Sequence, residues 1–246
     1  MKRILLIGLA LLTAAACRKI TPEQRIDDLS AYFTGRGSTH ADWLQNHDAD
    51  KRLDYLTLTL ARTLKATDLW TLDTDTGTSL VAEFPGSVKG AEAQLTLVSA
   101  SLGDPVACGA ALDVFEAFRA LKIRPRNTIR LLFYEPAADS TGLTGLAAVN
   151  REFRASSELI TFDIELSCRD TLPLHTFILE EKPLFVKQMI EVLPPYFKKL
   201  GTYSFIQGVY PNADWPLKAS TYRYRLDEGA LDRETAAVAT LIFLLN

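Results

Sequence analysis

Two apolar runs, residues 95–100 and 129–134, restrict the fold of this chain more than any other feature of its sequence. Neither LTLVSA nor IRLLFY alternates regularly between apolar and polar residues, which is typical of strands that are covered on both faces. A helical pattern over residues 110–123 lies between them. A strand, a helix and a second strand in this order predict a parallel β-α-β unit. In such units the functional residues commonly lie at the carboxyl ends of the strands.

Further strands and helices extend this pattern along the chain. We predict strands at 68–74, 79–86, 158–166 and 175–181, and helices at 21–33, 143–154, 183–201 and 232–246. Four leucines after residue 39 share one helical face and predict a long helical stretch; they are Leu53, Leu56, Leu60 and Leu64. The whole pattern predicts one α/β domain over residues 21–246, with a mostly parallel central sheet and helices on both faces.

The composition supports one folded domain and excludes a nucleic-acid-binding face. The chain has 246 residues, of which 48% are hydrophobic, and this is sufficient for one sizeable core. Its formal net charge is −3 and its lysines and arginines are scattered along the sequence. A nucleic-acid-binding protein would instead concentrate basic residues on one face.

The first sixteen residues predict a lipoprotein signal peptide. Basic MKR is followed by an apolar run of thirteen residues that ends in small residues directly before Cys17. Such a run is shorter than the ~20 residues of a membrane-spanning helix, so we expect it to be removed and Cys17 to be lipidated. Residues 17–20 would then form a short tether, and Arg18 favours the outer membrane, on its periplasmic face or at the cell surface. A secretory signal cleaved near Ala16 is the alternative.

The two remaining cysteines are Cys108 and Cys168. The cell envelope is an oxidising compartment and permits a disulfide between them. We expect two buried free thiols instead, because a buried cysteine commonly behaves as a small hydrophobic residue.

Three motifs carry a resemblance to a known family. They are FEAFRAL at 115–121, RNTIRLLFYE at 126–135 and GLTG at 142–145, and GRG at 35–37 adds to them. In this order they resemble the zinc-dependent aminopeptidases and their glutaminyl cyclase relatives, which form metallopeptidase family twenty-eight. The resemblance implies the zinc aminopeptidase (phosphorylase/hydrolase-like) fold and a metal centre at the carboxyl ends of the strands.

The side chains at the family's metal and catalytic positions differ from the family's own. The matched positions hold Ser101, Val106, Asp139, Ser140, Asp163 and Arg223. The resemblance implies that Ser101 and Arg223 replace histidine ligands and that Val106 replaces a bridging aspartate. It also implies that Asp139 and Ser140 replace a catalytic pair of glutamates. Asp163 keeps a carboxylate, and an ion pair with Arg223 would substitute for the positive charge of the metal.

A catalytic zinc needs about three ligands from imidazole, carboxylate or thiolate, and these positions do not supply them. We expect His40 and His47 to lie on the solvent-exposed surface of the N-terminal helical region, and His175 to be structural, at the start of a late strand. One alternative stays open if the loop that follows the strand at 95–100 carries a one-residue insertion relative to the family. An oxygen-only cluster suited to calcium or magnesium would then comprise Asp104, Glu135, Asp139 and Asp163.

These replacements predict a non-catalytic relative of the aminopeptidases, that is, a pseudoenzyme without a metal or other cofactor. We expect it to be anchored to the membrane by lipid on Cys17 and to bind a peptide-like ligand or a protein of the cell envelope. The alternative is an active metallopeptidase, an aminopeptidase with an altered zinc site.

Overall fold

The computed structural model describes residues 20–75, 77–88, 94–136, 159–168, 175–178, 206–208 and 220–245. The predicted signal, Cys17 and the helices predicted at 143–154 and 183–201 lie outside this part of the chain, and so do Asp139 and Ser140.

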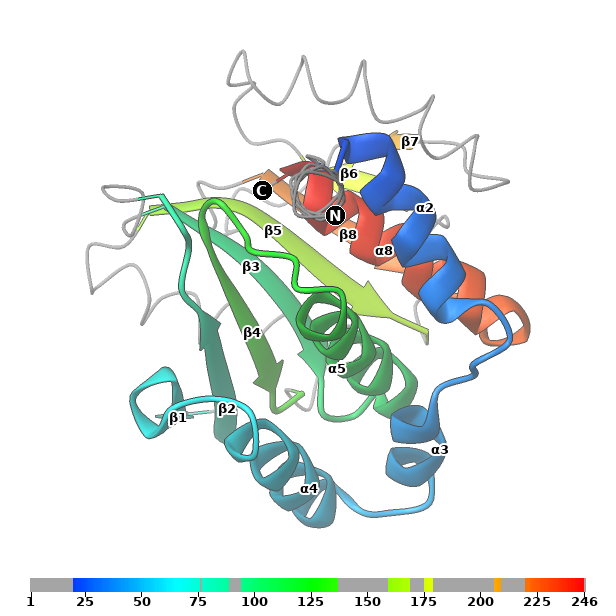
Figure 1. Ribbon diagram of the computed structural model, residues 1–246. Coiled ribbons are helices and arrows are strands. Elements are labelled where there is room, and N and C mark those ends of the chain that lie inside the picture. Colours follow the sequence, from blue (N-terminus) through cyan, green and yellow to red (C-terminus); the bar gives the residue numbers. More distant parts are fainter. Residues whose placement is uncertain are drawn as a thin grey trace, which may run out of the picture.

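An eight-stranded sheet forms the centre of the protein, in the order β1-β2-β4-β3-β5-β8-β6-β7 (Figure 1). The strands are β1 (Leu69–Thr74), β2 (Gly77–Phe84), β3 (Gln94–Ser101), β4 (Thr128–Tyr134), β5 (Leu159–Ser167), β6 (His175–Ile178), β7 (Ile206–Gly208) and β8 (Ser220–Arg225). The four central strands, β4, β3, β5 and β8, are parallel to one another, whereas β1, β2 and β6 pair antiparallel with their neighbours β2, β4 and β8. The predicted α/β class with a mostly parallel central sheet is therefore confirmed.

The two non-alternating runs of the sequence form β3 and β4, which pair in parallel near the centre of the sheet. All seven residues of β4 are buried. The helix between them is α5 (Pro105–Ala120), which begins earlier than predicted because Asp104 caps its first turn. The β-α-β unit predicted from these runs is confirmed.

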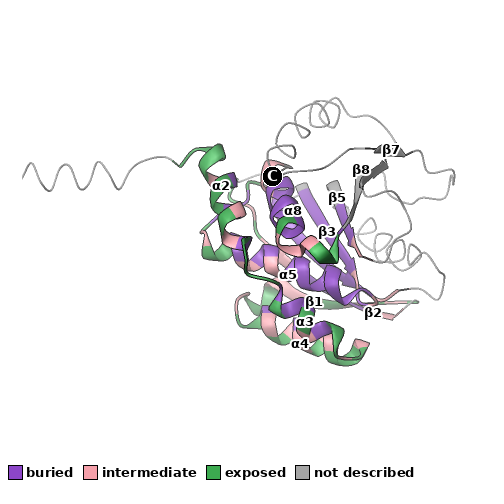
Figure 2. Cartoon of the chain, turned by 90° about the vertical axis from the view of Figure 1, so that its right-hand side faces the viewer, coloured by how far each residue is buried: buried purple, intermediate pink, exposed green. Residues whose placement is uncertain are grey.

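Two long helices, α5 and α8 (Leu231–Leu245), lie side by side against one face of the sheet (Figure 1). The helix α2 (Pro22–Phe33) packs on α8, and α3 (Thr39–Gln45) packs on α5. A capping box begins α2, since the Thr21 side chain accepts the Gln24 backbone N–H and the Gln24 side chain accepts that of Thr21. The burial pattern in Figure 2 places the core between the sheet and the inner helices.

The long helical stretch predicted after residue 39 is in fact two helices, α3 and α4 (Ala49–Ala61). The Asp48 side chain accepts the Lys51 backbone N–H and starts α4 anew. Leu56 and Leu60 are buried as predicted. The leucine spacing therefore identified the buried face correctly, but the helix cap between the two segments divides them.

Cys108 and Cys168 are both free, as predicted, although only Cys108 is fully buried. Among the described residues, no helix has the length and apolar character needed to cross a membrane.

Candidate functional site

Asp104 connects the β3–α5 junction to the carboxyl end of β5. Its Oδ1 accepts the backbone N–H of Ala107 at 3.1 Å and caps α5. Its Oδ2 accepts the backbone N–H of Cys168 at 2.6 Å and the hydroxyl of Ser167 at 3.3 Å. Asp104 is only 4% exposed. Both of its carboxylate oxygens thus hold secondary-structure elements of the protein together.

The other described side chains at this junction are poor metal ligands. The hydroxyl of Ser101 accepts the backbone N–H of Gly103 at 3.1 Å, and Val106 is buried in the first turn of α5. Burial raises the pKa of the Cys108 thiol well above its usual value, and this thiol donates to the backbone oxygen of Ser101. The described residues of the junction therefore do not fit the zinc centre that the family resemblance implies.

Asp163 lies inside β5 rather than at its end. The register makes it the partner of Leu97, whereas Ala100 pairs with Leu166 near the end of both strands. Ser167, which ends β5, is four residues beyond Asp163, or roughly 13 Å at ~3.3 Å per residue. Asp104 contacts Ser167 and Cys168 at the end of β5. Asp163 and Asp104 are therefore at different levels of the sheet.

Glu165 is a buried carboxylate near the end of β5 that the sequence analysis overlooked. It is 3% exposed, and its Oε1 accepts the hydroxyl of Tyr134 at 2.9 Å. The register places it beside Arg223 of β8. The predicted ion pair of Arg223 with Asp163 involves side chains outside the described part of the structure, so it stays a prediction. The sequence FDIEL could have pointed to Glu165, because Glu165 is two residues nearer to the strand end than Asp163.

Glu135 follows the last residue of β4 and is the remaining described member of the predicted oxygen-only cluster. Partial burial raises its pKa, and the negative charge of Asp50 raises it further. Asp139, another member of the predicted cluster, lies outside the described residues.

The prediction that His40 lies on the solvent-exposed surface is wrong. This side chain is buried between α3 and α5, with 8% exposure. The reason is a close approach of the two helices. A Cβ atom on Gly109 of α5 would lie 2.5 Å from the backbone nitrogen of Ala41, the residue after His40. The missing side chain of Gly109 lets α3 lie against α5, and periodicity within one helix could not reveal this contact.

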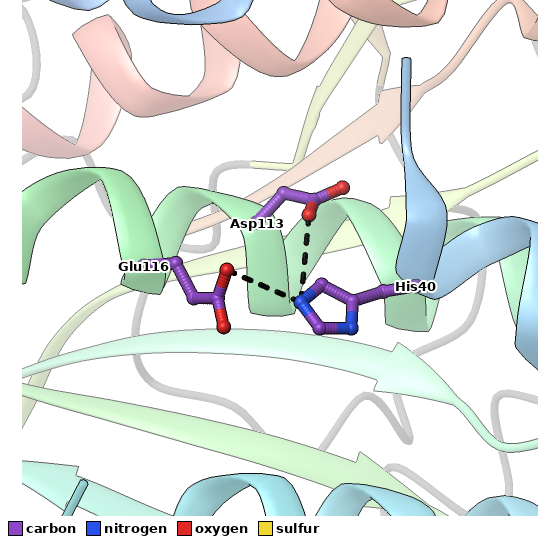
Figure 3. A group of neighbouring side chains, drawn as sticks. All are labelled: His40, Asp113 and Glu116. Atoms are coloured by element: carbon purple, nitrogen blue, oxygen red, sulfur yellow. Dashed lines mark ion pairs between the residues drawn. The ribbon is translucent and has the colours of Figure 1, made fainter. Parts of the chain in front are cut away.

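The imidazole of His40 faces two carboxylates of α5 (Figure 3). Its Nε2 lies 3.2 Å from Oε2 of Glu116 and 3.8 Å from Oδ1 of Asp113. Its Nδ1 lies 2.7 Å from the hydroxyl of Tyr55. The hydroxyl of Ser38 donates to the other oxygen of Asp113. These contacts fix the orientation of both His40 and Asp113, and we call His40, Asp113 and Glu116 the α3–α5 cluster.

Each member of the α3–α5 cluster has an altered pKa. Burial alone lowers the pKa of His40, but the hydrogen bond to Glu116 and the charges of both carboxylates raise it overall. The same hydrogen bond lowers the pKa of Glu116. Burial raises the pKa of Asp113 to about 6, against the hydrogen bond from Ser38 and the charge of His40. The two carboxylates therefore favour the positively charged form of His40, whereas burial disfavours the charged form of Asp113.

The α3–α5 cluster is separate from the β3–α5 junction. Asp113 and Glu116 come 8 and 11 residues after Pro105, the first residue of α5. At 1.5 Å per residue, they lie roughly 12 and 17 Å along the helix from the junction. The cluster is the one group among the described residues whose side chains could hold a metal ion, and the sequence analysis missed it.

The other two histidines lie elsewhere. His47 is half-buried and stacks on Trp43, with the ring centroids 3.7 Å apart, so it is less exposed than predicted. His175 begins β6, as predicted.

No protein-family profile matches the chain, and no curated protein sequence matches it significantly. Solved structures do resemble it. A leucine aminopeptidase precursor from Bacteroides thetaiotaomicron is 13% identical, with a TM-score of 0.54 over 92% of this chain and 97% of that one. A metallo-carboxypeptidase from Burkholderia cenocepacia is 11% identical, with a TM-score of 0.52 over 79% of this chain and 68% of the other.

A peptidase precursor of family twenty-eight from Shewanella amazonensis is 16% identical, with a TM-score of 0.51 over 69% of this chain. The chain spans 44% of the length of that protein. Similarity at this level of identity establishes the fold alone. The fold is that of the zinc exopeptidases, as the resemblance implied, and the activity has to be argued from the side chains of this chain.

Proposed function

We propose that this chain is a lipid-anchored domain of the cell envelope that has the zinc-exopeptidase fold, does not hydrolyse peptides, and binds a peptide-like ligand at the carboxyl edge of its sheet. The single observation that carries the proposal is the position of Asp104. This carboxylate lies between the end of β3 and the end of β5, and both of its oxygens accept hydrogen bonds, from α5 and from the end of β5.

Hydrolysis by a zinc peptidase has two requirements, and the matched ligand positions at this junction do not meet the first. A metal ion has to lower the pKa of a bound water to about 7, and a carboxylate has to act as general base. Ser101 and Val106 stand at matched ligand positions and supply neither imidazole nor carboxylate. Asp139 remains as a shortened base, with no metal-bound water for it to deprotonate.

The ligand can be tested with short peptides. We expect a tripeptide with a free amino terminus to bind the detergent-solubilised full-length protein saturably in calorimetry, and to be recovered intact by mass spectrometry. The N-acetylated tripeptide is the matched control for recognition of the amino group. Cleavage of the peptide would contradict the proposal. Failure of both peptides to bind would leave an envelope protein as the ligand.

The anchor is tested independently of the ligand. We expect the wild type to incorporate labelled fatty acid and to fractionate with the outer membrane, and Cys17→Ser to do neither. Cys168→Ser is the matched control and should keep the label. Recovery of unlabelled wild type in the soluble periplasmic fraction would refute the anchor.

One observation favours a second candidate function, an exopeptidase with an altered zinc site. The α3–α5 cluster offers an imidazole and two carboxylates with mutual distances that suit a metal. Its distance from the sheet edge, roughly 12–17 Å along α5, argues against a role in a cleft at that edge.

A further inference from the structure

The packing of α3 on α5 brings three metal-ligating side chains to one point. Asp113 and Glu116 are three residues apart and therefore share one face of α5. His40, the second residue of α3, points its Nε2 toward both (Figure 3). The three side chains come from two elements that are more than 70 residues apart in the sequence, so only the folded protein can assemble them.

The distances within the cluster are close to those of a zinc site. Ligand atoms at 2.0–2.1 Å from a tetrahedral zinc lie roughly 3.3 Å from one another. The His40 nitrogen is 3.2 Å from Glu116 and 3.8 Å from Asp113, and no two of the ligand atoms are more than 4.8 Å apart. A shift of about 1.5 Å is the most that zinc would require. The side chain of Glu116, which is 40% exposed, has the freedom to make it.

The surroundings of the cluster orient the ligands as in protein metal sites. The hydroxyl of Tyr55 bonds to Nδ1 of His40 and leaves Nε2 for the metal. The hydroxyl of Ser38 donates to Oδ2 of Asp113, whereas His40 faces Oδ1. Such partners fix ring orientation and ligand basicity. The partial exposure of Glu116 opens the cluster to solvent, which would provide the fourth ligand.

The charges also suit a dication. Two carboxylates face one imidazole, and a zinc ion with these ligands makes a neutral site. Besides His40, the charges of Arg36 and Arg119 act on Glu116 and lower its pKa. A mixed set of one imidazole and two carboxylates favours zinc or a similar transition metal over calcium, which prefers oxygen ligands alone.

We propose that His40, Asp113 and Glu116 form a zinc site that fastens α3 to α5. This site is distinct from the sheet edge, so the proposal does not depend on the proposed function. Its ligands are not those that the family resemblance places on the strands.

The test is zinc binding by the full-length protein. The detergent-solubilised chain is stripped with a chelator and dialysed against micromolar zinc, and the zinc per chain is measured by elemental analysis. We expect about one zinc per wild-type chain, and an affinity at least tenfold lower for Glu116→Gln and His40→Gln, by analogy with the 10–100-fold losses known even for outer-shell changes. His47→Gln is the matched control, because it removes a nearby histidine that is not in the cluster, and it should bind zinc as the wild type does.

A second readout separates metal binding from folding. Circular dichroism confirms that each variant is folded without metal. Zinc should then raise the melting temperature of the wild type and of His47→Gln, and raise that of Glu116→Gln by less at the same zinc concentration. Absence of zinc from the dialysed wild type would overturn the proposal. Equal binding by the wild type, His40→Gln and Glu116→Gln would overturn it as well.

Discussion

Replacing Asp104 tests whether this carboxylate is a structural residue of the β3–α5 junction. Asp104→Ala removes a helix N-cap, which costs about 0.5–2 kcal/mol. It also leaves the part-buried backbone N–H of Cys168 without its acceptor, which costs about 1–3 kcal/mol, toward the lower end for a donor that is only partly buried. We therefore expect a loss of roughly 1.5–5 kcal/mol in the free energy of unfolding.

Asp104→Asn separates the two contributions. The asparagine oxygen can still cap α5 by accepting the N–H of Ala107. Its amide nitrogen would then face the N–H of Cys168, so two donors would meet. We expect Asp104→Asn to lose the β5 contact and keep the cap, at a cost of about 1–3 kcal/mol, between those of the wild type and Asp104→Ala.

The assay is thermal unfolding, in which each kcal/mol shifts the melting temperature by about 2–4 °C for a chain of this size. Asp48→Ala is the matched control, because Asp48 caps the exposed start of α4 and has a smaller effect without a strand contact. The same destabilisation should appear with and without a chelator. The reasoning is refuted if Asp104→Ala is as stable as the wild type, or if its effect disappears once the metal is removed.

Two further predictions follow from single groups. Cys168 should react with iodoacetamide in the native protein much faster than Cys108, whose burial raises the thiol pKa, and both should react in denaturant without a reductant; labelling that requires prior reduction would show a disulfide. Glu135→Gln should be as stable as the wild type at a pH below the usual glutamate pKa, where both side chains are neutral. Because burial raises the pKa of Glu135, the charged form is disfavoured in the folded state, so the variant should become relatively more stable as the pH rises through that raised pKa. A relative stability that does not change between pH 3.5 and 8 in unfolding experiments would contradict this.

The central β-α-β unit could be predicted from the sequence because its signals are local. The residues of β3 and β4 are apolar without alternation, and the capping box of α2 lies within four residues. In contrast, β8 was missed because its sequence, STYRYR, carries two arginines and does not read as a buried central strand. Its place in the sheet depends on pairing with β5, a contact between residues far apart in the chain.

The same distinction applies to the candidate sites. Spacing along the chain identified the β3–α5 junction, but not that Asp104 holds the end of β5. The burial of His40 depends on Gly109, which lets α3 approach α5. Neither contact has a periodic signature, because each joins segments about 60 or more residues apart.

The most direct test of the central claim is turnover of aminoacyl-p-nitroanilides by the full-length protein, first with added zinc and then with a chelator. A panel of substrates with apolar, acidic and basic first residues covers the specificity of an aminopeptidase. We predict no hydrolysis above that of buffer under either condition, even when zinc is bound at the α3–α5 cluster. Hydrolysis that a chelator removes, added zinc restores, and Asp104→Ala abolishes but His40→Gln does not, would show an active metal centre at the sheet edge and contradict the account.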